Sequence, residues 1–253
     1  SRAFTPRAVA SWEPVIRDIA GRLVDSWLPP AGGATTVELL ERFAVPLPVE
    51  VIARALGVSD ERLDDFKRWS DDSVAGIGTA ISFEERLASQ RGVNELQHHF
   101  ASELERRRVE PTDDLLSALV HASIEDDSGD DLDDRRPLDL PELLGIIQQL
   151  LVAGNETTTK LLCETMRMLA ERPEEWAALR SDPSRIPAVV EESLRLASPV
   201  QGMFRVATRD TVLGGVPIAA GTRVVASFGS ANRDEAVFAD PESFVPGRPD
   251  VSE

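Results

Sequence analysis

A long apolar helix pattern near the middle of this 253-residue chain constrains the fold most strongly. Asp139-Leu140-Pro141-Glu142 has the spacing of a capping box with proline in the first turn, and no further proline follows until Pro173. We predict a helix that runs to about Glu171, with a length of about 50 Å at 1.5 Å per residue. A helix of that length crosses a whole domain, so the other elements must pack along it.

The rest of the chain divides into a helical part and a short β-containing part. Apolar residues recur every three or four positions in the first part, which predicts helices over 12–27, 37–56, 61–74 and 83–108. Short β-like runs follow at 204–207, 212–213, 216–218 and 223–227, with Gly214-Gly215 as a hairpin turn. We therefore expect one domain that is mainly α with a small β part, helical over 1–200 and β or irregular over 201–253.

Composition and charge exclude several classes of partner. The chain is 42% hydrophobic and 28% charged, as in an ordinary globular protein, and its formal net charge of −17 disfavours nucleic acids and anionic membranes. No apolar run approaches the roughly 20 residues of a membrane span, and no signal peptide is visible. The single cysteine, Cys163, rules out an internal disulfide bond and fits a reducing compartment. We expect a soluble cytoplasmic protein.

Small and polar residues interrupt the long helix pattern at Ala153-Gly154-Asn155-Glu156-Thr157. A glycine inside a helix costs about 1 kcal/mol relative to alanine, so Gly154 needs a local reason. Either a neighbouring helix packs closely there, or a flat ligand lies against the helix. Glu156 is costly to bury unless it has a partner or handles protons. The residues alone leave both interpretations open.

Arginines in the second half form further candidate sites. Glu192 and Arg195 are three residues apart, a spacing that is common for exposed pairs on helices. Arg248 ends the string Pro241-Glu242-Ser243-Phe244-Val245-Pro246-Gly247-Arg248. Arg205 lies in a β-like run, where it is either an ordinary edge arginine or the partner of a carboxylate.

In this order, these strings resemble the oxygen-activation helix and the Glu-x-x-Arg helix of the heme-thiolate cytochrome P450 monooxygenases of the soluble bacterial type. Ala153 through Thr157 match the family string Ala/Gly-Gly-x-Asp/Glu-Thr position by position. The resemblance implies that Ala153 and Gly154 lie against the heme, and that Glu156 and Thr157 deliver protons to dioxygen. Asn155 occupies the variable position of the string.

The resemblance also assigns roles to residues outside this helix. It implies a buried structural network of Glu192, Arg195 and Arg248, and a bond from Arg205 to a heme propionate. The side chains expected to face the substrate are Val152, Val200, Gln201 and Met203. The segment 74–81, with two glycines, is expected to act as a lid over the pocket.

Two heme-anchoring segments of the family have no counterpart in the chain. The loop with the axial cysteine should follow Arg248, and the helix that binds the other propionate should precede Ser1. Cys163 lies six residues past Thr157, about 120° around the same helix, so it should point away from the heme. We therefore expect a fragment, truncated at both ends, that neither holds heme firmly nor turns over alone.

The intact enzyme would take electrons from a ferredoxin or a flavin reductase and insert one oxygen atom of O2 into a small organic substrate. The alternative is a heme-free relative that binds and stabilises a partner enzyme. Glu156, Thr157 and Arg205 argue against that alternative, because only heme chemistry needs them.

Three other patterns have simpler explanations. His98, His99 and His121 lack the spacing of metal ligands, and we expect them on the surface. The acidic run 125–134 is typical of an exposed loop. It contains the Asp-Asp-x-x-Asp spacing of class I terpene cyclases, but the second metal motif of that family would need a carboxylate where Cys163 stands.

Overall fold

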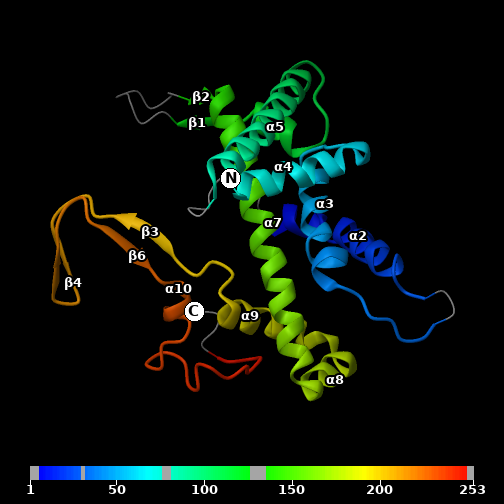
Figure 1. The fold of residues 1–253 in the computed structure, drawn as a ribbon, viewed down its shortest axis with the longest axis vertical. Helices are drawn as coiled ribbons and strands as arrows, with labels where there is room; N and C mark the ends of the chain where they lie inside the picture. The colour runs from blue at the N-terminus through cyan, green and yellow to red at the C-terminus, as the bar shows by residue number, and fades with distance from the viewer. Residues whose placement is uncertain (1–5, 30–31, 76–80, 126–134, 250–253) are drawn as a thin grey trace. The chain divides into compact units, whose positions relative to one another are not determined.

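The computed structural model describes residues 6–29, 32–75, 81–125 and 135–249 (Figure 1). Most of the segment expected to be a lid (74–81) and most of the acidic run (125–134) lie outside these residues. The chain divides into two compact units, Ser1–Glu156 and Thr157–Glu253, and the division falls within one long helix. The single domain expected from the sequence remains a prediction.

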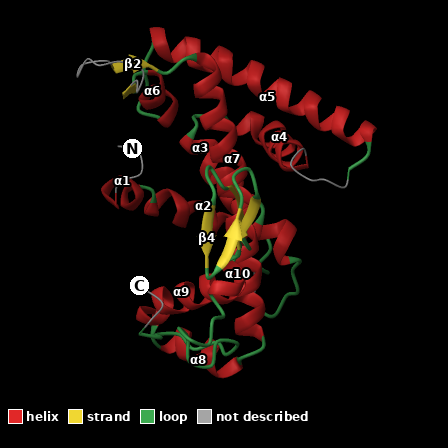
Figure 2. Ribbon diagram, turned by 90° about the vertical axis from the view of Figure 1, so that its left-hand side faces the viewer, coloured by secondary structure: helices red, strands yellow, loops and turns green. Residues whose placement is uncertain are grey.

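Helices build almost all of the first unit (Figure 2). A single antiparallel strand pair, β1 (Ser123–Glu125) with β2 (Arg135–Pro137), is its only described sheet. The helices in chain order are α1 (Pro6–Ser11), α2 (Glu13–Asp25), the π-helix η2 (Leu40–Ala44), α3 (Pro46–Ala55), the 3-10 helix η3 (Asp60–Arg62), α4 (Leu63–Ala75), α5 (Phe83–Val109), α6 (Leu115–Val120) and the first part of α7 (Leu140–Ala170).

The predicted long helix is α7, 31 residues in length. Its N-terminus carries the predicted capping box: the Glu142 N–H donates to Asp139 Oδ1, and the Asp139 N–H donates to Glu142 Oε2, each over 2.8 Å. Leu143, Ile147 and Leu151 follow at four-residue spacing and are completely buried in the core of this unit. Each such side chain contributes about 1.5–3 kcal/mol of hydrophobic free energy.

The helix predicted over 37–56 is wrong in its first half. A π-helical turn, η2, precedes α3, and the Val45 N–H donates to the Leu40 carbonyl over 2.9 Å. The cause is Pro46, which has no N–H to continue the regular ladder and whose fixed φ suits the first turn of a new helix. The predicted end at Gly57 is confirmed, since its φ is +66°.

A buried ion network joins the end of α5 to the start of α6. Asp114 caps α6 by accepting from the Ser117 N–H over 2.8 Å, and it also accepts from Arg107 Nε over 2.8 Å. Arg107 bonds Glu103 one turn earlier, over 2.9 Å. Gly57 is required beside this network, because a Cβ there would lie 2.7 Å from both Arg107 Nη2 and Asp114 Oδ2.

Asp114 makes the stability of the first unit depend on pH. Burial by itself would raise the pKa of Asp114, but hydrogen bonds from Arg107, the Ser117 N–H and Thr112 lower it to about 2. Because the folded pKa lies below the unfolded value of 3.8, the stabilisation is complete above pH 3.8 and is lost as the pH falls toward 2. We expect acid unfolding curves of Asp114→Asn to lose this component. An unchanged acid transition in that variant would contradict the assignment.

The second unit contains the end of α7 and three shorter helices, α8 (Pro173–Ser181), the 3-10 helix η4 (Pro183–Arg185) and α9 (Ile186–Ala197). Strand β3 (Met203–Val206) pairs antiparallel with β6 (Arg223–Ala226), and β4 (Thr211–Leu213) forms a hairpin with β5 (Val216–Ile218) between them in the chain. Gly214 and Gly215 have φ of 55° and 81°, which confirms the predicted turn. The short helix α10 (Phe228–Ala231) follows, and the small core contains Met168, Leu169, Val189, Leu196 and Phe244.

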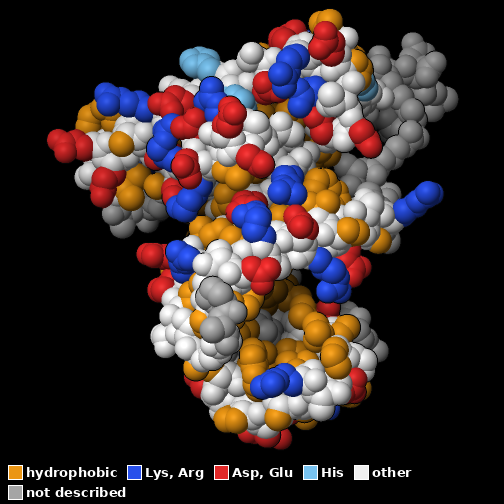
Figure 3. Space-filling model, turned by 90° about the vertical axis from the view of Figure 1, so that its right-hand side faces the viewer, with side chains coloured by type: hydrophobic (Ala, Val, Ile, Leu, Met, Phe, Trp, Pro, Cys, Tyr) orange, Lys and Arg blue, Asp and Glu red, His pale blue; other side chains and the backbone are white. Residues whose placement is uncertain are grey.

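The surface carries charges of both signs. Acidic and basic side chains are interspersed over the face drawn in Figure 3. Many pair within one helix, such as Lys67 with Asp71 over 2.8 Å and Arg167 with Glu171 over 2.7 Å. Exposed pairs of this kind stabilise a helix by only a few tenths of a kcal/mol. In the described part of the chain, none of the helices has the length and apolarity of a membrane span.

Candidate functional site

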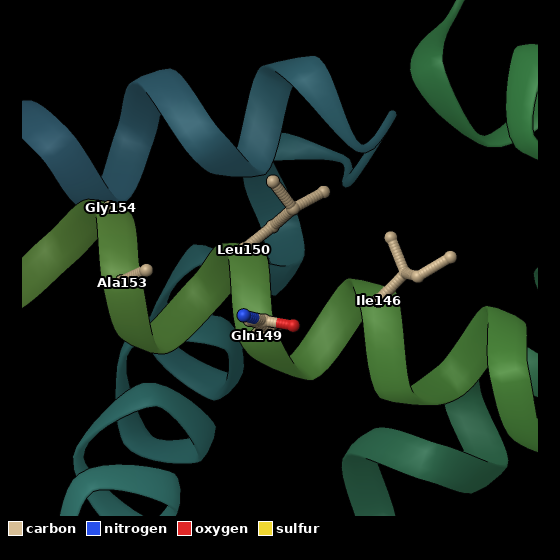
Figure 4. A pocket seen from close by; sticks show the side chains of 5 residues that line it. All are labelled: Ile146, Gln149, Leu150, Ala153 and Gly154. Carbon is tan, nitrogen blue, oxygen red and sulfur yellow. The ribbon is translucent and has the colours of Figure 1, made fainter. Parts of the chain in front are cut away.

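The middle of α7 lines a pocket in the first unit. Figure 4 shows the five lining side chains on successive turns of the helix, and the pocket volume is about 380 Å³. Ala153 is exposed and Gly154 is half-buried at one end of this stripe. The other lining residues are Ile146, Gln149 and Leu150. The predicted small pair therefore borders open space, as a site for a flat ligand requires.

Gly154 also has a packing role. A Cβ at this position would lie 2.8 Å from Ile52 Cδ1 and 3.5 Å from Ile52 Cγ1, so α3 approaches α7 closely at the glycine. Of the two reasons that the sequence left open, close helix packing is thus present in the structure. The space available to a ligand lies beside Ala153 and Leu150 on the pocket side.

Glu156 and Thr157 are consecutive on α7, and both are half-buried, as is Val152 one turn earlier. A half-buried carboxylate and hydroxyl in one helical turn can hold and pass protons.

Asn155 is the residue that sequence reasoning missed. It is 7% exposed, and its Nδ2 donates over 2.8 Å to the hydroxyl of Ser70, a completely buried residue of α4. The signal that could have revealed it is the four-residue spacing of Leu143, Ile147 and Leu151, which Asn155 continues.

The structure brings Glu192, Arg195 and Arg248 together. Glu192 is 0% exposed, and its carboxylate accepts two bonds of 2.8 Å from Arg195 and one of 3.0 Å from Arg248 Nε. The Val245 N–H donates to the same carboxylate over 2.8 Å. Burial by itself would raise the pKa of Glu192, but the hydrogen bonds from the two guanidinium groups and the backbone N–H outweigh it and lower the pKa.

Both arginines also bind backbone carbonyls of the irregular segment that precedes Arg248. Arg195 donates over 2.7 Å to the carbonyls of Asn232 and Pro241, and Arg248 donates over 2.9 Å to that of Ser243. The network therefore fastens a segment with little regular secondary structure onto α9. Buried groups that bond one another in this way stabilise the packing of the segments that they join.

Arg205 projects from β3 and is exposed. Its guanidinium donates over 2.9 Å to the neighbouring Phe204 carbonyl and over 3.9 Å to the Met203 sulfur, and it forms no ion pair with the described residues. An arginine in this state is available to a carboxylate ligand.

Gln201 has a contact that the sequence did not predict. Its Nε2 donates to the carbonyls of Ala197 and Ser198 at the end of α9, over 3.0 and 2.8 Å. The missing side chain of Gly229 leaves the space in which the Gln201 amide lies. Gln201 therefore orients the chain that enters β3, while its neighbours Val200 and Met203 are 42% and 46% exposed.

Histidine and cysteine offer no metal site within the described ranges. The expectation that all three histidines lie on the surface is wrong for His99. It is half-buried, and its ring lies 5.2 Å from that of Trp69 and 5.1 Å from that of Phe100, because α4 and α5 pack closely. Burial lowers the pKa of His99, which favours the neutral ring. Cys163 is half-buried on α7 in the second unit.

A comparison with known proteins identifies the family. The profile of the Cytochrome P450 family matches residues 88–253 of the chain. The chain belongs to the cytochrome P450 family.

Individual cytochromes P450 are similar to nearly the whole chain. Cytochrome P450 109 of Bacillus spizizenii is 39% identical over 252 residues, and the erythromycin C-12 hydroxylase of Saccharopolyspora erythraea is 38% identical over 251. Each alignment covers 98% of this chain and 59% of the relative. The chain thus spans about three fifths of the length of these cytochromes P450.

Solved structures of cytochromes P450 are also similar to nearly the whole chain. The ligand-free cytochrome P450 TbtJ1 has a TM-score of 0.86 and 40% identity, over 98% of this chain and 62% of that one. Cytochrome P450 CYP109Q5 from Chondromyces apiculatus has a TM-score of 0.82 and 43% identity, over 97% and 57%. The predicted fold class, a partial cytochrome P450 fold that is mainly α with a small β part, is confirmed.

Proposed function

We propose that this chain belongs to a heme-dependent monooxygenase, which inserts one oxygen atom of O2 into a small organic substrate. A ferredoxin or a flavin reductase would be the electron donor. The observation that carries the proposal is the Glu156–Thr157 pair next to the open pocket at Ala153 on α7. The names of two relatives, erythromycin C-12 hydroxylase and 6-deoxyerythronolide B hydroxylase, support the reaction type. They also favour an apolar or polyketide-like substrate.

Each of the two units, taken by itself, contains residues whose chemistry suits heme. The apolar stripe that ends at Ala153 and Gly154 provides a surface for one face of a flat macrocycle. Arg205 provides an unpaired, exposed guanidinium for a propionate. Heme, when bound, supplies the redox chemistry that activates dioxygen. The axial thiolate of the family would have to come from a cysteine other than Cys163, which lies on α7 itself.

The side chains of α7 handle protons in this proposal. Reduction of dioxygen to water and an inserted oxygen atom consumes two protons. The hydroxyl of Thr157, or a water that it holds, would be the last proton donor. Glu156 would supply that donor with a new proton. Val152, Val200 and Met203 would contact the substrate, while Gln201 orients the segment that carries the latter two.

Arg205→Ala tests the propionate contact. We expect the variant of the full gene product to lose heme about tenfold faster or more, because a charge-assisted hydrogen bond of about 1.5–3 kcal/mol disappears. The measurement is heme transfer to an apo-globin acceptor. Arg209→Ala, at an exposed position outside the strand, is the matched control. Equal loss rates for the two variants would remove Arg205 from the heme site.

The test of the proposal as a whole is the absorption spectrum of the reduced protein with carbon monoxide. We expect the full product of the gene to show the band of a thiolate-ligated heme, and the 253-residue chain with added heme to show none. A full gene product that takes up no heme would overturn the proposal. It would favour the heme-free, partner-stabilising role instead.

A further inference from the structure

We propose that the hydrogen bond between Ser70 and Asn155 sets the rotation of α7 and thereby positions Glu156 and Thr157 for proton delivery. Asn155 Nδ2 donates to Ser70 Oγ over 2.8 Å, across 85 positions of sequence. The two residues are 7% and 0% exposed. This inference rests on the proposed monooxygenase function and names positioning residues for it.

The place of Asn155 on the helix is the first argument. Leu143, Ile147 and Leu151 form a completely buried stripe, and Asn155 is the next position of that stripe. An apolar side chain would continue the pattern, whereas an asparagine there loses its hydration and needs a partner. The buried stripe thus changes from apolar to polar at Asn155, directly before Glu156 and Thr157.

The partner helix is held firmly, which is the second argument. α4 packs along α5, and the hydroxyl of Ser89 donates over 2.5 Å to the Asp72 carbonyl. Gly92 of α5 has no side chain where the Asp72 carboxylate lies, so the two helices meet at close range. Ser70 is therefore a fixed point of the first unit against which α7 can be oriented.

The chemistry of the pair is the third argument. Leucine and isoleucine contacts are non-directional, so the apolar stripe tolerates small rotations of α7. A buried hydrogen bond has a preferred length and angle, and single buried polar residues are known to set helix register at some cost in stability. Glu156 and Thr157 follow Asn155 by one and two residues, so any rotation at Asn155 displaces both side chains.

The test compares three variants with a matched control. Ser70→Ala and Asn155→Leu each break the bond, and the double variant Ser70→Ala/Asn155→Leu replaces both partners by apolar groups. Ser73→Ala is the control: Ser73 is also buried in α4, but its hydroxyl donates over 2.8 Å to the Trp69 carbonyl of its own helix.

Two readouts separate positioning from mere stability. We expect the double variant to regain most of the unfolding midpoint that Ser70→Ala loses, since neither side chain of this pair is left buried without the other. In the full gene product we nevertheless expect it to convert at least tenfold less of the consumed O2 into product, with KM within about twofold. A double variant that couples oxygen to product as the parent does would overturn the proposal.

Backbone amide exchange of the 253-residue chain decides the question independently of heme. We expect the amides of 155–158 to exchange at least tenfold faster in Ser70→Ala, and at the parent rate in Ser73→Ala. Equal exchange in both variants would overturn the positioning role. The full gene product could also show no heme spectrum while exchange is faster in Ser70→Ala alone. That result would reject the monooxygenase function and retain the contact between the two helices.

Discussion

Glu192→Ala is expected to lower the free energy of unfolding of the second unit by about 3–5 kcal/mol, because it leaves two buried guanidinium groups without their carboxylate. Arg195 and Arg248 both donate to this side chain, and it is completely buried. The loss would be measured by urea unfolding, with amide exchange over α9 to locate it. Glu191→Ala, at the adjacent exposed position, is the matched control and should change stability little.

The same residue gives the second unit an acid-sensitive component. The pKa of Glu192 is lowered in the folded state, so its stabilisation is complete above the ordinary value of 4.5 and is lost as the pH falls below it. Stability of the parent chain should therefore decrease from about pH 4.5 downward more steeply than that of Glu192→Ala. If both proteins lose stability in parallel, the carboxylate is not the group that titrates.

Thr157→Val is expected to lower the rate of product formation of the full gene product by 10²–10⁴, the usual contribution of a positioned proton donor. Valine keeps the size and the branching of threonine and removes only the hydroxyl. Glu156→Gln removes the ionisable group one residue earlier and should give an effect of the same order. The measurement is the rate of product formation, with the product formed per O2 consumed recorded beside it.

The next residue supplies the control. Thr158 is exposed on α7, and Thr158→Val should retain the parent rate within about twofold. If Thr157→Val also retains it, the proton pathway does not pass through this helix turn. In the proposed role Glu156 and Thr157 act as one unit, so we expect the double variant to lose little more than the less active single variant.

Much of the local structure followed from patterns within one or two turns. The capping box at Asp139, the glycine cap at Gly57 and the hairpin at Gly214-Gly215 are decided by groups a few residues apart. The departure from the helix predicted over 37–56 is also local, because Pro46 has no N–H to continue the regular helix ladder. The hairpin of β4 and β5 was predicted from its turn, whereas the pairing of β3 with β6 was not predicted.

Most of the long helices, the family and the spacing of Glu192 and Arg195 could be predicted from the chain alone, because helix periodicity, caps and turns are local properties. Which distant groups meet could be seen only in the folded chain. Examples are the bond from Asn155 to Ser70, the space that Gly229 leaves for the Gln201 amide, and the contacts of His99 with the rings of Trp69 and Phe100. Burial and pairing depend on how segments far apart in sequence pack, and no spacing within one segment specifies that.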